Sequence, residues 1–279
     1  MEQIPFIKMH GLGNDFVIID GRETPPDLSV AALRAIADRH RGVGFDQLIV
    51  LEPTDADADL FMRIYNADGS ESEACGNATR CVAHTLMLET GKDNVVIKTL
   101  GGLLPGTADG NGGVVIDMGK PNLGWQQIPL ASEEDTAHVR IEAGPLCDPV
   151  AINMGNPHAV FFVEDAESID LEKWGPQLET DPIFPKRANI SVASKMDNGD
   201  FRLRVWERGV GITLACGSAA CATMVAANLR GLAGNSATLH LNGGPLNMHL
   251  DDRGHVFMGG GIATSYKGIL DHNLLQGAV

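Results

Sequence analysis

The sequence predicts an α+β protein built from two copies of one domain, residues 1–119 and 120–262, followed by a short tail, 263–279. Three observations support this prediction: a long internal repeat, one long apolar helix expected in the middle of each copy, and short hydrophobic segments typical of strands on both sides of that helix. We expect the tail to pack back on the first copy.

The internal repeat keeps a nearly constant spacing. Arg63-Ile64-Tyr65-Asn66 aligns with Arg204-Val205-Trp206-Glu207 at an offset of 141 residues, and that offset also superimposes two Ala-Cys-Gly triplets. Closer to the start of each copy the offset is 142, which aligns Gln47 with Asn189. This unit is much longer than the 20–50 residues of solenoid repeats, so we interpret it as a duplicated domain.

The elements follow the same order in each copy. Buried strands, bounded by Gly and Asp turns, are predicted at residues 16–19, 47–51, 95–97 and 114–116 of the first copy, and at 159–163, 189–192 and 255–257 of the second. The two long helices are predicted at about 76–89 and 217–230. Each ends near a glycine, Gly91 or Gly231, as helix C-termini commonly do.

Composition excludes several classes of function. The chain carries 21 Lys and Arg against 36 Asp and Glu, a net charge of −15, which disfavours nucleic acid and anionic membrane surfaces as partners. We expect no secretory signal and no membrane span, because no sufficiently long apolar run occurs. Five cysteines, an odd number, are typical of reduced thiols, so we expect a cytoplasmic protein.

Cys75 and Cys216 each come directly before a predicted long helix, within Ala-Cys-Gly. The start of a helix carries unpaired N–H groups and partial positive charge, which lowers the pKa of a thiol and binds anions such as a carboxylate. One thiolate and one thiol are the base and acid that inversion of a carbon centre requires. Cys81 and Cys221 are expected to be core residues, and Cys147 receives no role.

Motifs for cofactors are absent from the sequence. The segment Gly11-Leu12-Gly13 lacks the third glycine of a dinucleotide fingerprint, and no phosphate-binding Walker loop occurs. The cysteine spacings are not those of zinc sites. We therefore expect chemistry that needs no cofactor and no metal.

Several ordered motifs resemble those of the diaminopimelate epimerase family. They are His10-Gly11-Leu12-Gly13-Asn14-Asp15-Phe16, Asn66-Ala67-Asp68-Gly69-Ser70, Ala74-Cys75-Gly76-Asn77, Gly155-Asn156-Pro157-His158, Glu207-Arg208-Gly209 and Ala215-Cys216-Gly217. The resemblance implies two pseudo-symmetric α/β domains, each a curved, mostly antiparallel sheet around a central helix, with the active site in the cleft between them. It also implies epimerisation of LL- to meso-diaminopimelate, a small-molecule substrate, in lysine and peptidoglycan precursor biosynthesis, without metal or pyridoxal phosphate.

The resemblance also implies roles for individual residues. Cys75 and Cys216 match the base and acid, His158 matches a residue near them, and Glu207 is counted with these catalytic candidates. Arg208 and the asparagines would hold the distal carboxylate, and Glu207 the distal ammonium. The residues expected to bind substrate are Asn14, Gln47, Asn66, Gly76, Asn77, Asn156, Asn189, Glu207, Arg208, Gly217 and Ser218.

Two other interpretations stay open from the sequence. The first is a racemase or epimerase of another amino acid from the same superfamily, such as proline, although proline lacks the second head group that Glu207 and Arg208 suit. The second is a thiol redox protein, although such proteins usually carry Cys-x-x-Cys, which is absent here. The oligomeric state is also open, with a homodimer as one option.

Overall fold

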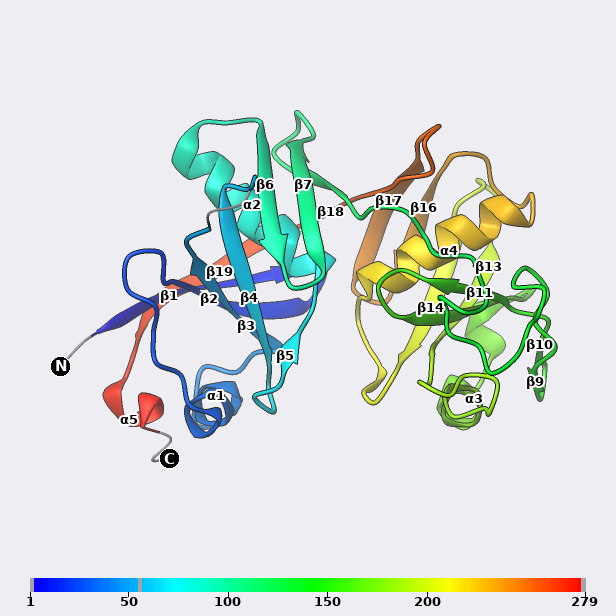
Figure 1. The fold of residues 1–279 in the computed structure, drawn as a ribbon, viewed down its shortest axis with the longest axis horizontal. Coiled ribbons are helices and arrows are strands. Elements are labelled where there is room, and N and C mark those ends of the chain that lie inside the picture. The colour runs from blue at the N-terminus through cyan, green and yellow to red at the C-terminus, as the bar shows by residue number, and fades with distance from the viewer. Residues whose placement is uncertain (1–2, 55–56, 277–279) are drawn as a thin grey trace. The chain divides into compact units, whose positions relative to one another are not determined.

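A computed structural model describes residues 3–54 and 57–276 of the chain. The chain divides into two compact units, Met1–Ile116 with Gly261–Val279, and Asp117–Gly260 (Figure 1). The last residues of the predicted tail, 277–279, lie outside the described part.

The first unit contains nine strands and three helices. They are β1 (Ile4–Gly11), β2 (Asn14–Asp20), α1 (Val30–Ala37), β3 (Gln47–Glu52), β4 (Leu60–Asn66), β5 (Glu71–Ser72), α2 (Gly76–Thr90), β6 (Asn94–Thr99), β7 (Gly102–Ala108), β8 (Val114–Asp117), β19 (Ala263–Leu270) and α5 (His272–Leu275). β8 ends one residue beyond the boundary between the units, and the count covers the described residues only. β19, from the tail, pairs antiparallel with β1.

The second unit repeats this order after a short hairpin. Its elements are β9 (Glu142–Ala143), β10 (Leu146–Cys147), β11 (Val150–Asn153), β12 (Pro157–Phe162), the 3₁₀ helix η1 (Ala166–Ser168), α3 (Leu171–Glu179), β13 (Asn189–Lys195), β14 (Phe201–Glu207), β15 (Gly211–Ile212), α4 (Gly217–Leu229), β16 (Ser236–Leu241), β17 (Gly244–Leu250) and β18 (Val256–Gly260).

Strand register reproduces the repeat seen in the sequence. β2 and β3 run parallel with Phe16 opposite Gln47, and β12 and β13 run parallel with His158 opposite Asn189. Both pairs differ by 142 residues. The parallel pairing of β4 with β6 recurs as β14 with β16, and the other matching pairings, such as β6 with β7 and β16 with β17, are antiparallel. The two units therefore share one topology.

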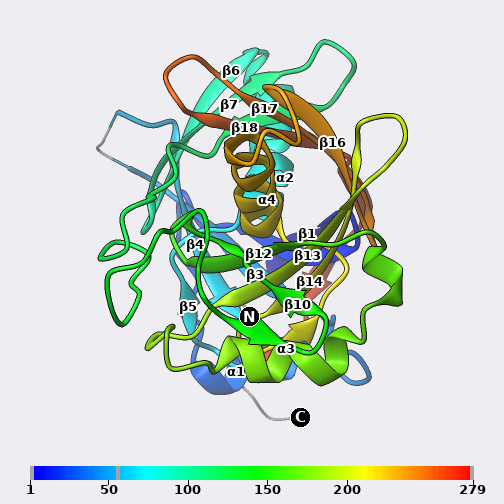
Figure 2. The same ribbon diagram turned by 90° about the vertical axis from the view of Figure 1, so that its right-hand side faces the viewer.

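A long helix lies against the strands within each unit. α2 contacts β1, β6 and β7, and α4 contacts strands from both ends of its unit, β11 to β13 and β16 to β18 (Figure 2). α2 begins after Cys75 and ends at Gly91, whose φ is +71°; α4 begins after Cys216 and is followed by Gly231, with φ +66°. Both predicted helices are confirmed to within one residue, and glycine suits these left-handed positions.

Two shorter helices, α1 and α3, were not predicted. α1 has only eight residues after its N-cap Ser29, and α3 contains Pro176, which normally argues against a helix interior. Packing stabilises both: α1 buries Leu33 and Ile36 against β2 and β3, and α3 buries Leu178 in the core of the second unit. Local sequence signals were too weak to find elements that depend on this burial.

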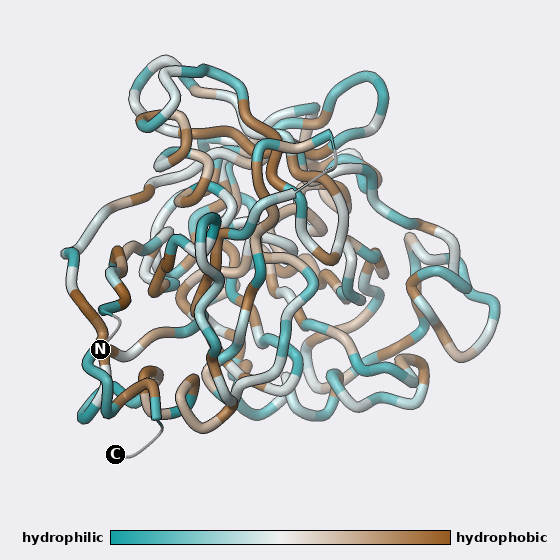
Figure 3. Tube along the Cα trace, turned by 60° about the vertical axis from the view of Figure 1, so that its left-hand side comes forward, coloured by the Kyte–Doolittle hydropathy of each residue, from teal (hydrophilic) through white to brown (hydrophobic). Residues whose placement is uncertain are grey.

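Hydropathy follows the fold. In Figure 3 many of the loops that project from the trace are hydrophilic, whereas hydrophobic segments lie in strands and helices. Strand residues such as Val17, Ile19, Leu48 and Val50 are at most 2% exposed. In the part of the chain that the structure describes, no helix is long and apolar enough to cross a membrane.

Candidate active site

Cys75 occupies the N-cap position of α2. Its extended backbone, with φ −149° and ψ 106°, brings the chain from β5 into the helix. The sulfur lies 3.8 Å from Asn14 Oδ1, and Asn77 Nδ2 donates to the same oxygen at 3.3 Å. Asn14 belongs to β2, so the structure brings three predicted residues together from two distant segments.

Gln47 and Asn66 form a second predicted pair in the first unit. They lie opposite each other on β3 and β4, and Gln47 Nε2 donates to Asn66 Oδ1 at 3.1 Å. Asn66 Nδ2 in turn donates to Ser70 Oγ at 3.1 Å. Asp46, the residue before Gln47, accepts a hydrogen bond from Asn14 Nδ2 at 2.9 Å. Because Asn14 also contacts Cys75, this bond connects the segment of Gln47 with the surroundings of Cys75.

Cys216 occupies the equivalent N-cap position of α4, with φ −130° and ψ 107°. Unlike Cys75, it is buried, at 6% exposure. Its sulfur lies 3.6 Å from Ser218 Oγ in the first turn of the helix. The Glu207 carboxylate, at the end of β14, also interacts with this thiol. The structure therefore brings together three predicted residues of the second unit.

The expected lowering of the pKa at a helix start is wrong for Cys216. Burial raises the pKa of its thiol well above the ordinary value, and the neighbouring Glu207 carboxylate raises it further. The hydrogen bond from Ser218 lowers it only in part. Desolvation and a nearby negative charge both disfavour the thiolate, and together they outweigh the partial charge of the helix end. In this state Cys216 is a thiol.

Glu207 is held by a residue that sequence reasoning missed. Thr213 Oγ1 donates to Glu207 Oε1 at 2.5 Å, from the turn that leads to Cys216. Asp46 was missed as well. Both lie within three residues of a predicted site residue, and this proximity was the only signal in the sequence that pointed to them.

The amide of Asn189 forms hydrogen bonds with backbone groups at both of its polar atoms. The residue is 3% exposed; its Nδ2 donates to the Pro157 carbonyl at 3.1 Å, and its Oδ1 accepts from the Arg208 N–H at 2.9 Å. The guanidinium of Arg208 is exposed and donates to the Lys186 carbonyl at 3.0 Å. Asn189 therefore holds the turn that carries Arg208.

His158 is fully buried and pairs with Asn156. Its Nε2 lies 2.7 Å from Asn156 Oδ1, and because an amide oxygen only accepts, Nε2 carries the proton. Burial lowers the pKa of His158 to about 3, and the positive charge of Arg208 contributes. The imidazole is therefore neutral near pH 7.

The two glycines after the cysteines supply backbone donors. Gly76 and Gly217 are the first residues of α2 and α4, and both are buried. The N–H groups of a first helical turn have no partner within the helix, so they suit an anion such as a substrate carboxylate. No group of His, Cys, Asp and Glu among the described residues could hold a metal ion.

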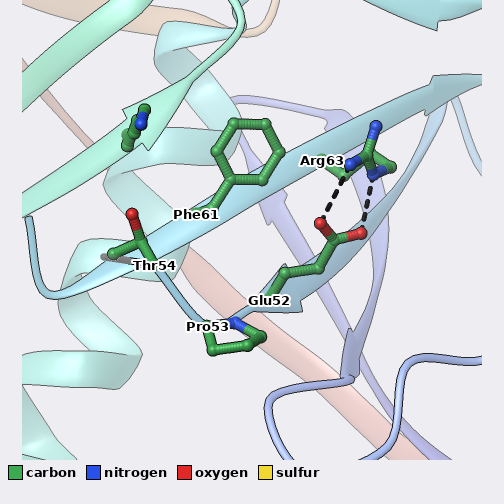
Figure 4. Close-up of a pocket in the computed structure, with 6 residues that line it drawn as sticks. Glu52, Pro53, Thr54, Phe61 and Arg63 are labelled. Atoms are coloured by element: carbon green, nitrogen blue, oxygen red, sulfur yellow. Dashed lines mark hydrogen bonds and ion pairs between the residues drawn. The ribbon is translucent and has the colours of Figure 1, made fainter. Parts of the chain in front are cut away.

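A surface pocket lies on another part of the first unit. It is lined by Glu52, Pro53, Thr54, Phe61, Arg63 and Lys98 (Figure 4). Arg63 Nε donates to Glu52 Oε1 at 2.6 Å across it. None of the predicted site residues lines this pocket, so we do not assign the active site to it.

Comparison with known proteins places the chain in a family. A family model described as diaminopimelate epimerase matches residues 6–124 and 150–264. The chain belongs to the diaminopimelate epimerase family. Within it, the chain is 54% identical to a protein named diaminopimelate epimerase from Rhodospirillum centenum, covering 98% of this chain and 94% of that one. It is also 54% identical to a protein named diaminopimelate epimerase from Acidiphilium cryptum, over 97% of this chain and 98% of that one.

The fold is shared more widely than the family. A crystal structure of a hydroxyproline epimerase from Agrobacterium vitis superposes with a TM-score of 0.67, at 15% identity, over 96% of this chain and 92% of that one. At this identity the likeness concerns the fold alone. It confirms the predicted fold class of two similar α/β units, and the family match confirms the resemblance found in the motifs.

Proposed function

We propose that this protein interconverts LL-2,6-diaminopimelate and meso-diaminopimelate by a cofactor-independent mechanism with two thiols. It is thus an isomerase of lysine and peptidoglycan precursor biosynthesis. The family match over most of the chain carries this proposal. The duplicated Ala-Cys-Gly at two helix starts supports it, because inversion of a carbon centre requires one base and one acid.

The two cysteines have different environments, and this difference suggests their starting roles. Cys216 is a buried thiol beside Glu207, which suits the group that delivers a proton. Cys75 is partly exposed, and by its match to the family it is the base towards the LL isomer. The proposal requires both sulfurs to reach one α-carbon from opposite faces. Reversing the reaction exchanges the two roles.

The remaining residues are assigned by their match to the family, and the chemistry of their side chains fits these roles. The first-turn N–H groups that begin at Gly76 and Gly217, together with Asn77 and Ser218, bind the reacting carboxylate, on which negative charge grows as the α-proton leaves. Arg208 binds the distal carboxylate, and Glu207 the distal ammonium. His158, neutral and buried, supports this constellation rather than serving as a charged acid. The remaining substrate contacts are assigned to Asn14, Gln47, Asn66, Asn156 and Asn189.

Turnover of LL-diaminopimelate in heavy water tests the proposal. Wild-type protein should form the meso isomer and place deuterium first in the product, because the incoming proton comes from a thiol that exchanges with solvent. Cys75→Ala and Cys216→Ala should each abolish interconversion, whereas Cys81→Ala, which alters a fully buried core thiol, should retain it. Proline serves as the comparison substrate. Turnover of proline but not of LL-diaminopimelate would overturn the proposed substrate.

The exposed face of β19 bears on the oligomeric state of the protein. β19 pairs with β1 and exposes Tyr266 and Ile269, at 47% and 57%. An exposed strand that carries these two apolar side chains suits association with a second copy, so we propose a homodimer through this face. Light scattering of wild type and Tyr266→Ala tests it; a wild-type monomer would overturn it.

The odd number of cysteines in the sequence, five, suits reduced thiols and a reducing compartment, so we propose a cytoplasmic location. Cell fractionation tests this, and recovery outside the cytoplasmic fraction would contradict it. We propose neither nucleic acid nor membrane as a partner.

A further inference from the structure

We propose that Asp46 is a positioning residue that fixes the orientation of the Asn14 amide and thereby controls protonation of the Cys75 thiol. The inference rests on the proposed function, since it concerns one of its two cysteines. It starts from three hydrogen bonds on one carboxylate. Asp46 Oδ2 accepts from Asn14 Nδ2 at 2.9 Å and from the Asp15 N–H at 3.1 Å, and Asp46 Oδ1 accepts from Arg39 Nη2 at 2.9 Å.

The carboxylate settles which way the amide faces. A carboxylate that accepts three donors cannot also donate, so the Asn14 amine must face Asp46. The Asn14 oxygen then faces the opposite way, where Cys75 Sγ lies at 3.8 Å and Asn77 Nδ2 at 3.3 Å. An amide oxygen can accept from a thiol but repels a thiolate. In this orientation Asn14 stabilises Cys75 in its protonated form while the site is empty, and Cys75 serves as the base towards the LL isomer through the fraction that is ionised.

The position of Asp46 is itself well determined. Its own N–H donates to the Asp15 carbonyl at 3.0 Å, which returns the bond that it receives from Asp15. Arg39 spans both carboxylates, with Nη2 at 2.6 Å from Asp15 and 2.9 Å from Asp46. The buried Lys8 holds the far side of Asp15 at 2.5 Å. Asn14 belongs to β2. These ion pairs hold the loop that precedes β3 against this strand.

The second unit lacks this arrangement. At the repeat offset of 142 residues, Asp46 corresponds to Ala188 and Asp15 to Pro157. Asn156, the counterpart of Asn14, instead turns its oxygen to the His158 ring at 2.7 Å. Duplicated asparagines are thus oriented by different partners, and the Asp46 arrangement acts on Cys75 alone.

Alkylation of cysteines tests the inference without substrate. Purified protein is treated with iodoacetamide between pH 6 and pH 9, and each cysteine is followed by peptide mass spectrometry. In Asp46→Asn, the charged Arg39 attracts the new amide oxygen, so the new amine replaces Oδ2 and faces both the Asp15 N–H and the Asn14 amine. The Asn14 amide can then rotate and offer its oxygen to that amine. The Asn14 amine then faces Cys75 and favours the thiolate. We expect alkylation of Cys75 at pH 7 to rise about threefold or more, with the pH profile shifted to lower pH.

Controls separate this effect from lost charge and from unfolding. The exposed Cys147 reports general reactivity in the same sample, and Asp109→Asn alters another loop-capping carboxylate of the unit. In an Asn14→Ala background, Asp46→Asn should change Cys75 alkylation by less than about twofold, because nothing remains to rotate. An equal rise in both backgrounds would show a direct effect of charge and overturn the proposal. An unchanged rate in Asp46→Asn would overturn it as well, whereas failure of turnover in wild type would bear only on the proposed function.

Discussion

The carboxylate of Glu207 interacts directly with the thiol of Cys216, and Thr213 fixes that carboxylate through a hydrogen bond of 2.5 Å. A buried negative charge beside a buried thiol is a costly arrangement unless the thiol stays protonated. The relationship explains why this cysteine, although placed at a helix start, has a raised pKa. The pKa of Cys216 is thus subject to two opposing neighbours, since Glu207 raises it and Ser218 lowers it.

Changes at Glu207 and Ser218 should therefore move the reactivity of Cys216 in opposite directions. Glu207→Gln removes the charge that raises the pKa of Cys216, so alkylation of this thiol at pH 8 should become faster. Ser218→Ala removes the hydrogen bond that lowers the pKa, so alkylation should become slower. Peptide mass spectrometry measures both rates, with Cys147 as the internal reference. Parallel changes in the two variants would contradict this account.

Arg208→Lys should lose most activity towards diaminopimelate. A guanidinium can make two parallel hydrogen bonds to a carboxylate, which an ammonium cannot reproduce. We expect kcat/KM to fall at least about thirtyfold, which corresponds to about 2 kcal/mol. Steady-state kinetics measure it, with Arg253→Lys as the control, because the Arg253 side chain is 71% exposed and pairs only locally with Asp251. Equal kinetics in the two variants would remove Arg208 from the site.

His158 should make the protein sensitive to acid. Its pKa is about 3 in the folded protein, against about 6.5 in an unfolded chain. Between these values the unfolded chain binds a proton that the folded chain does not, so stability falls as pH drops from about 6.5 towards 3. His158→Gln should lose less stability between pH 7.5 and pH 4.5 than wild type. Urea unfolding measures the slope; the exposed His40→Gln should keep the wild-type slope.

Asp15 should contribute stability that acid removes. Burial alone would raise its pKa, but hydrogen bonds from Arg39 and Lys8 outweigh burial and lower the pKa to about 2. The contribution is therefore complete above about pH 5 and is lost as pH falls towards 2. Asp15→Asn should cost about 1–2 kcal/mol at pH 7, allowing for solvent screening, and the difference should shrink below pH 4. Denaturation at several pH values measures it, and the exposed Asp27→Asn should show no such trend.

The sequence by itself determined the features that depend on spacing along the chain. The offset of about 141 residues, the two Ala-Cys-Gly triplets and the glycines that end α2 and α4 predicted the duplication and both long helices. These signals are local, since a helix start and a C-terminal glycine need only a few neighbouring residues. The ordered motifs also indicated the family, which the comparisons confirmed.

Only the tertiary structure decided what surrounds each cysteine. Cys75 and Cys216 occupy equivalent positions in the repeat, yet one is partly exposed beside Asn14 and the other is buried beside Glu207. The state of a thiol depends on desolvation and on the groups that folding brings close to it. Asn14 reaches Cys75 from 61 residues away, and Glu207 reaches Cys216 through the pairing of β14 with β15. For the same reason α1, α3 and the Asp46 arrangement were absent from the prediction, because each depends on the packing of distant strands. The Thr213 contact is closer in the sequence, six residues from Glu207, and depends on the pairing of β14 with β15.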